Sequence, residues 1–145
     1  MDLPEYVTVE EVQRVCEELG FRDWTQLTSP EVLKEEAEVL QSAAGGEALQ
    51  IPLEEFQKGL EVELEHGRFF PDANVTNNHP ILTARIVLAH LKEMLDYYSR
   101  LEVAEIEGDM LKASLANNPE KLAAKYKKLL TARHHLTKWE ANGNI

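Results

Sequence analysis

Hydrophobic side chains recur three and four positions apart along most of the chain, a spacing that places them on one face of an α-helix. Segments with this spacing begin near Thr8, Ser29, Pro52, Pro80 and Asn118. Serine, threonine and asparagine cap the free amides of a helix start, and proline is tolerated in the first turn. No strand-rich region interrupts these segments. The pattern therefore predicts an all-α bundle of five or six helices.

The helix signals at the amino-terminal end are the most explicit. The run "TVEE" is a capping box, in which the Thr8 hydroxyl accepts a hydrogen bond from an early amide and Glu11 reaches back. Gly20 is expected to end this first helix, and Phe21 and Trp24 in the link "FRDWTQL" are expected to fill the core. Ser29-Pro30 is expected to open a second helix that runs to the Gly45-Gly46 break.

The segment after Pro80 has the longest hydrophobic pattern. Leu88, Leu91 and Leu95 lie on one stripe, and a second apolar stripe lies on nearly the opposite side. A helix that is apolar on two sides has neighbours on both. We expect a long central helix that starts at Pro80 and continues without interruption as far as Asn117.

Charge divides the chain differently. The formal charge is −11, but residues 119–145 carry six Lys/Arg against two Glu, which gives +4, and residues 1–118 carry nine against 24 Asp/Glu, which gives −15. We expect an acidic core domain over residues 1–118 and a basic amphipathic helix over 119–145 that packs on the core or on a partner. Its inward side chains are predicted to be Leu122, Tyr126, Leu129, Leu136 and Trp139. The acidic core should repel nucleic acid and anionic membranes.

The same sequence indicates a cytoplasmic protein. No apolar run approaches the roughly 20 residues that cross a bilayer. The start "MDLPEY" is acidic and lacks the apolar segment of a signal peptide. The single cysteine, Cys16, cannot form an internal disulfide and is expected to be a buried, inert thiol.

Candidate chemistry lies in two pairs of residues on two predicted helices. Glu63 and His66 are three residues apart in "GLEVELEHG", and His90 and Glu93 have the same spacing in "AHLKEMLDYY". Residues at this spacing project from one side of a helix. If the two helices are antiparallel neighbours, all four side chains could face one pocket.

Imidazoles and carboxylates are the usual ligands of zinc, manganese and non-haem iron. The four residues therefore predict a divalent-metal site, which Glu35, Glu36 or Glu38, or His79, could complete. Two other interpretations stay open, namely a metal-free structural polar network and a catalytic acid–base pair. The loop "GRFFPDANVTNNHP" is expected to be either functional or packed by its own side chains.

Three motifs together resemble a family of small bacterial and phage proteins that is known as a domain of unknown function. They are "GLEVELEHG", "NVTNNHP" and "AHLKEMLDYYSRLE", with a weaker likeness at "GFRDW". The similarity covers about residues 52–103. It implies that Glu63, His66, His90 and Glu93 belong to a shared pattern, and it brings no established activity.

The sequence favours a non-enzymatic helical scaffold or interaction protein, in a phage or mobile-element context, with residues 119–145 as the surface for a protein partner or for self-association. One alternative is a metal-dependent hydrolase or oxidase that uses the Glu63, His66, His90 and Glu93 cluster. The other is an acidic mimic of nucleic acid that inhibits a DNA- or RNA-binding protein.

Overall fold

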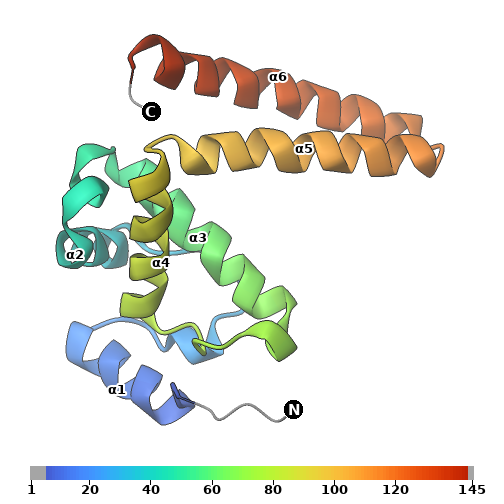
Figure 1. Cartoon of the computed structure of the whole chain (residues 1–145). Coiled ribbons are helices and arrows are strands. Elements are labelled where there is room, and N and C mark those ends of the chain that lie inside the picture. The colour runs from blue at the N-terminus through green and yellow to red at the C-terminus, as the bar shows by residue number, and fades with distance from the viewer. Residues whose placement is uncertain (1–5, 144–145) are drawn as a thin grey trace. The chain divides into compact units, whose positions relative to one another are not determined.

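The computed structural model describes residues 6–143, so the predictions made for "MDLPE" lie outside the described residues. Within this range the chain forms six α-helices and no strand, which confirms the all-α prediction (Figure 1). The helices are α1 (Val9–Leu19), α2 (Lys34–Ala44), α3 (Leu53–Phe69), α4 (Pro80–Glu93), α5 (Tyr97–Leu115) and α6 (Pro119–Ala141). No helix among the described residues combines the length and the apolar character that a membrane span needs.

The described residues fall into two compact units, one that ends at Lys92 and one that starts at Glu93. The first unit contains α1 to α4, and the second contains α5 and α6. The core of the first unit includes Val12, Trp24, Val32, Ala37, Leu40, Ala48, Phe56, Leu60, Leu64, Ala84, Val87 and Leu91. The division into an acidic core domain over residues 1–118 and a basic helix over 119–145 stays a prediction.

Helix α1 begins and ends where the sequence predicts. The Thr8 hydroxyl accepts a hydrogen bond from the Glu11 amide, and Gly20 ends the helix with a φ of 69°. That left-handed conformation is one that glycine adopts without strain. The reciprocal half of the capping box is absent, because the Glu11 carboxylate binds Arg14 instead. Cys16 is buried as expected, and burial raises the pKa of its thiol.

Helix α2 starts later than the sequence predicts. Ser29-Pro30 was expected to open it, but the helix begins at Lys34. The preceding residues are held extended by α3, since the Glu61 carboxylate accepts from the Val32 amide at 3.1 Å and the Gln57 side chain donates to the Val32 carbonyl at 2.7 Å. A local capping signal is overridden here by tertiary hydrogen bonds.

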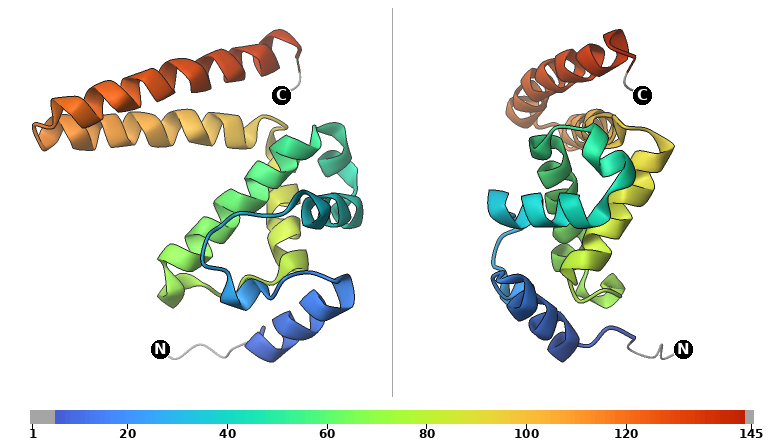
Figure 2. Two further views of the ribbon diagram at one scale, coloured as in Figure 1. Left: turned by 180° about the vertical axis from the view of Figure 1, so that it is seen from behind. Right: turned by 90° about the vertical axis from the view of Figure 1, so that its left-hand side faces the viewer.

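Helix α3 begins after Pro52, as predicted, and buries Phe56, Leu60 and Leu64. It continues past Gly67 and ends at Phe69. Figures 1 and 2 show α3 and α4 crossing obliquely within the first unit. The site prediction assumed that these two helices are antiparallel neighbours. In the structure they cross instead.

The expectation of one uninterrupted helix from Pro80 to Asn117 is wrong. Helix α4 ends at Glu93, and α5 begins at Tyr97 after a turn in which the Tyr97 amide donates to the Met94 carbonyl. Asp96 stands at the cap position of α5, is buried, and forms an ion pair with Arg100 at 2.7 Å. Hydrophobic spacing continues through this turn, so periodicity alone does not reveal it.

The second unit is a helical hairpin in which α5 and α6 lie side by side (Figures 1 and 2). The Asn118 side chain caps α6 by accepting from the Lys121 amide, as predicted. The interior of the hairpin contains a hydrophobic cluster of Val103, Ile106, Leu129 and Ala132, with Met110 and Leu136 partly buried beside them. Among the residues predicted to face inward, Leu129 and Trp139 are buried, but Tyr126 is 50% exposed.

Candidate functional site

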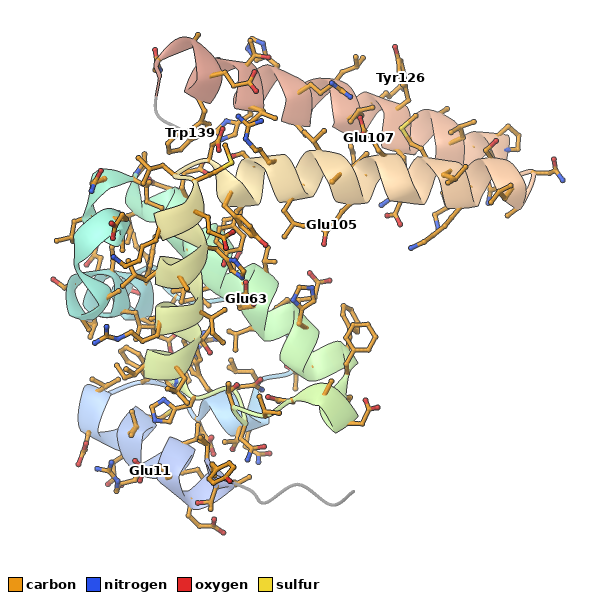
Figure 3. All side chains as sticks on the ribbon, viewed as in Figure 1. Glu11, Glu63, Glu105, Glu107, Tyr126 and Trp139 are labelled. Atoms are coloured by element: carbon orange, nitrogen blue, oxygen red, sulfur yellow. The ribbon has the colours of Figure 1, made fainter. Side chains whose placement is uncertain are left out.

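The Glu63 carboxylate brings two predicted site histidines together within the first unit. One carboxylate oxygen lies 3.6 Å from His90 Nε2 on α4, and the other lies 3.9 Å from His66 Nδ1 on α3. The Glu63 side chain is only 14% exposed, whereas those of His66 and His90 are 53% and 31% exposed. Figure 3 shows Glu63 on α3 at the side of that helix where α4 crosses it. The crossing therefore produces part of the expected juxtaposition.

The other predicted contributors are elsewhere. Glu93 is exposed at the last position of α4 and is the first residue of the second unit. Glu36 is engaged by Arg22, and Glu35 and Glu38 are exposed. His79 precedes α4, and His90 lies eleven positions along that axis, which is about 16 Å at the helical rise. His79 therefore cannot complete a mononuclear site with His90.

Among residues 6–143, no group of three or more His, Cys, Asp or Glu side chains is arranged so that it could hold a metal ion. At 3.6 and 3.9 Å, the contacts of Glu63 are longer than direct hydrogen bonds. In this arrangement the cluster can act as a polar contact that joins α3 to α4. Metal binding at Glu63, His66, His90 and Glu93 stays a prediction.

His79 has a structural role at the start of α4. It is buried, its Nδ1 lies 3.4 Å from the Leu82 amide and accepts from it, and its carbonyl accepts from the Thr83 hydroxyl at 3.0 Å. Burial lowers the pKa of His79, an effect that nearby Glu11 partly opposes. An imidazole that accepts at Nδ1 must be neutral. The fold is therefore built around the uncharged form of this histidine.

The free energy of unfolding is expected to fall as the pH drops below about 6.5, the usual pKa of histidine in an unfolded chain. Because the folded pKa of His79 is lower, the unfolded state takes up the proton first, and acid favours unfolding. Denaturant titrations at a series of pH values should show a smaller drop for His79→Asn, since asparagine can also cap the helix. An equal decrease in the free energy of unfolding of the wild type and of His79→Asn would contradict this role of His79.

The asparagine-rich loop is packed by its own side chains, which is one of the two outcomes that the sequence allowed. The Asn74 side-chain amide donates to the Gly67 backbone carbonyl and to the Asn78 side-chain oxygen, both at 3.1 Å. The Asn77 side-chain amide donates to the Val7 backbone carbonyl at 2.6 Å. Asn77 and Asn78 have φ values of 49° and 62°, a region that asparagine tolerates better than most residues. These contacts tie the loop to the end of α3 and to the segment before α1.

Gly67→Ala is expected to destabilise the protein by about 1–3 kcal/mol, because the loop closes directly over this glycine. A Cβ atom here would clash with the Asn78 Oδ1 atom and lie 3.1 Å from the Asn74 Nδ2 atom, so these hydrogen-bonded side chains must shift. Gly108→Ala is the matched control in α5, where a Cβ would meet nothing within 4 Å. It should stabilise by up to about 1 kcal/mol. A stabilising Gly67→Ala in chemical denaturation would contradict the loop geometry.

The strongest polar site in the first unit was not predicted from the sequence. The Glu36 side chain is 4% exposed and accepts from Arg22 Nε at 3.1 Å, Arg22 Nη2 at 2.8 Å and the Leu33 amide at 3.0 Å. Burial by itself raises the pKa of Glu36, but the hydrogen bonds from Arg22 and Leu33 outweigh it, so the pKa is lowered. Two features of the sequence could have indicated this ion pair. They are Arg22 within "GFRDW" and Glu36 in the first turn of α2, where its carboxylate accepts from the Leu33 amide.

One side of the α5–α6 hairpin carries large apolar side chains in solvent. An ion pair between Glu107 and Arg133 marks this side on both helices. At 100° per residue, Leu111 and Leu115 lie 40° and 80° from Glu107, and Tyr126 and Leu130 lie 20° and 60° from Arg133. These four residues, here called the apolar face, are exposed by 61%, 75%, 50% and 53% in that order. Figure 3 shows Tyr126 directed outward from α6.

The described residues form an all-α protein in which Glu63 of "ELEHG" contacts His90 of "AHL". The chain belongs to the family described as "Protein of unknown function (DUF5661)", whose model matches residues 12–107. No curated protein and no solved structure matches the chain. The matched residues include all four predicted site residues and end within α5. Helix α6 lies beyond them.

Proposed function

We propose that the protein is a non-enzymatic helical scaffold or interaction protein that binds a protein partner through the apolar face of Leu111, Leu115, Tyr126 and Leu130. The observation that carries the proposal is the exposure of these four side chains, each by half or more, on one side of two neighbouring helices. Single exposed apolar residues are normal on protein surfaces, whereas a group that shares one side marks an interaction surface.

The surroundings of the apolar face support the same function. The hydrophobic cluster between α5 and α6 does not include the four residues of the apolar face, which stay exposed. Exposed Lys127 lies 60° from Leu130 at 100° per residue, which places a polar side chain at the edge of the apolar face. The sequence predicted residues 119–145 as the association surface. The surface proposed here covers one side of α6 and also includes Leu111 and Leu115 of α5.

Photo-crosslinking in the host cell tests this function. A benzophenone side chain in place of Tyr126 should form a covalent adduct with a bound protein, whatever the identity of that protein. The matched control is the same replacement at Tyr6, which is 88% exposed in the first unit. Adducts at position 126 and none at position 6 would support the proposal. Equal yields, or no adduct at 126, would overturn it.

We also propose that Glu63, His66 and His90, with Glu93, bind a divalent metal such as zinc, manganese or iron. Support comes from the Glu63 carboxylate, which contacts two imidazoles from two helices. Three or four N and O ligands at about 2.0–2.2 Å are typical of such ions. Binding would require His66 and Glu93, both exposed, to turn toward Glu63.

Elemental analysis of untagged protein is expected to show close to one metal ion per chain if this second proposal holds. His66→Ala and His90→Ala should each lose most of the metal, since a site that lacks one ligand binds far more weakly. His134→Ala is the control, because His134 is an exposed histidine of α6. Metal-free wild-type protein after growth in supplemented medium would leave the cluster as a structural contact.

A further inference from the structure

The apolar face has a charge pattern that suits one kind of partner. Its ion pair places an acid, Glu107, on α5 and a base, Arg133, on α6. The helices differ in the same sense along their length: α5 carries four Asp/Glu against two Lys/Arg, and α6 carries six Lys/Arg against two Glu. A partner that covers both helices and matches their charge must therefore present basic groups to α5 and acidic groups to α6.

A second copy of this hairpin meets that requirement. If two copies stack by these faces around a twofold axis parallel to the helices, α5 of each packs on α6 of the other. Each Glu107 then faces the helix that carries the other Arg133, and Leu111 and Leu115 face the helix that carries the other Tyr126 and Leu130. The interface is self-complementary, as a twofold interface must be.

The alternative occupants fit less well. An acidic protein or an anionic lipid surface would suit α6 but would be repelled by the carboxylates of α5. The second unit, residues 93–145, carries eight Lys/Arg and eight Asp/Glu, so its formal charge is zero. It therefore has no net attraction for polyanions, and the whole formal charge of −11 belongs to residues 1–92.

The energetic reason for a second copy is the apolar surface that the hairpin leaves in solvent. A hydrophobic cluster of four buried and two partly buried residues joins helices of 19 and 23 residues, and the four residues of the apolar face lie outside it. A packed pair of layers is the usual way in which helices bury their apolar surface. Two stacked hairpins would form a four-helix bundle, in which the apolar face becomes part of a shared core.

We propose that two copies of the chain associate through the apolar faces of their α5–α6 hairpins to form an antiparallel four-helix bundle. This inference rests on the proposed function, because it names the partner of the same surface. It is specific about geometry, since α5 must meet α6 of the other copy for acid to face base. A pairing of α5 with α5 would place Glu107 near Glu107 and is disfavoured.

Sedimentation equilibrium of the purified full chain, from micromolar to submillimolar concentration at physiological salt, tests the inference. The 16.5 kDa chain should approach twice its mass as concentration rises. Leu111→Gln with Leu130→Gln should weaken the dimer by at least about tenfold. The control is Leu49→Gln, which removes a leucine that is 61% exposed in the first unit and should change nothing. Circular dichroism should show unchanged helix content in all three proteins.

Charge reversal separates a second copy from a foreign partner. Arg133→Glu should weaken the dimer, because two acids then meet, and Glu107→Arg with Arg133→Glu should restore it. The double reversal inverts the charges that any other partner would meet, so only a second copy remains complementary. A monomeric wild type, or a double variant that stays as weak as the single one, would overturn the inference. A monomer that still forms heavier adducts at position 126 in cells would overturn it and leave the proposed function standing.

Discussion

Arg22→Met is expected to lower the free energy of unfolding by about 3 kcal/mol. Removing one member of a buried ion pair costs about 3–5 kcal/mol, because the remaining charge is left without a partner in a dry site. Glu36 is that charge: its side chain is 4% exposed, and Arg22 supplies two of its hydrogen bonds by side chain and a third by its backbone amide at 3.2 Å. Because the Arg22 side chain is 36% exposed, water softens the loss, and we expect the lower end of that range.

Chemical denaturation of two further variants isolates the pair. Adding Glu36→Gln to Arg22→Met should recover part of the lost stability, since the uncompensated charge is gone. Lys92→Met is the matched control, because it breaks a 2.7 Å ion pair with Glu47 in which the Lys92 side chain is 56% exposed. That variant should differ little from wild type. Equal losses for Lys92→Met and Arg22→Met would show that burial of Glu36 is not the cause.

Phe56→Ala is expected to destabilise the protein by about 3–5 kcal/mol, the range for removing a buried aromatic side chain. Phe56 is fully buried and lies on the core face of α3 with Leu60 and Leu64. The loss combines the transfer of the ring to water with the cavity left behind. Glu63 lies on the same helix. A variant in which α3 is loosened should therefore form the contact between Glu63 and His90 less often.

The control for this change uses the same residue type on the same helix. Phe69, the last residue of α3, is 66% exposed, so Phe69→Ala should change the free energy of unfolding by no more than about 0.5 kcal/mol. Thermal or denaturant unfolding of both variants would measure the difference. A comparable loss at Phe69 would mean that this end of α3 is covered in solution by something other than the described residues.

Helix starts and the core face of α3 could be predicted because local chemistry decides them. Thr8, Pro52, Pro80 and Asn118 mark helix starts in the structure as they do in the sequence. A capping residue or a first-turn proline acts on amides within one turn, so its effect is visible without knowledge of the fold. The same reasoning identified the burial of Cys16 and Trp24.

Elements decided by distant contacts could not be predicted in this way. Ser29-Pro30 has the local features of a helix start, but Glu61 and Gln57 of α3 hold the following Val32 extended. The break between α4 and α5 is not visible in the hydrophobic spacing, which continues through the turn where the Tyr97 amide donates to the Met94 carbonyl. Tyr126 also follows the helical spacing, and only the position of α5 shows that it lies outside the interface between the two helices.

The candidate site was predicted in part for the same reason. The spacing along α3 predicted that Glu63 and His66 share one side of that helix. The structure places both near each other and brings His90 of α4 to the same carboxylate, where the two helices cross. Glu93 shares a helix side with His90 but is exposed at the end of α4. The Arg22–Glu36 pair joins residues 14 positions apart across an irregular link, and no periodic pattern reports such a contact.

Solvent labelling of Tyr126 inside cells tests the central claim most directly, which is that the apolar face is covered when the protein works. Hydroxyl-radical modification of Tyr126 should be several-fold lower in cells than in dilute purified protein, while Tyr6, which is 88% exposed in the first unit, should be labelled equally in both. Tyr126 modified to the same extent in cells and in dilute solution would contradict the account.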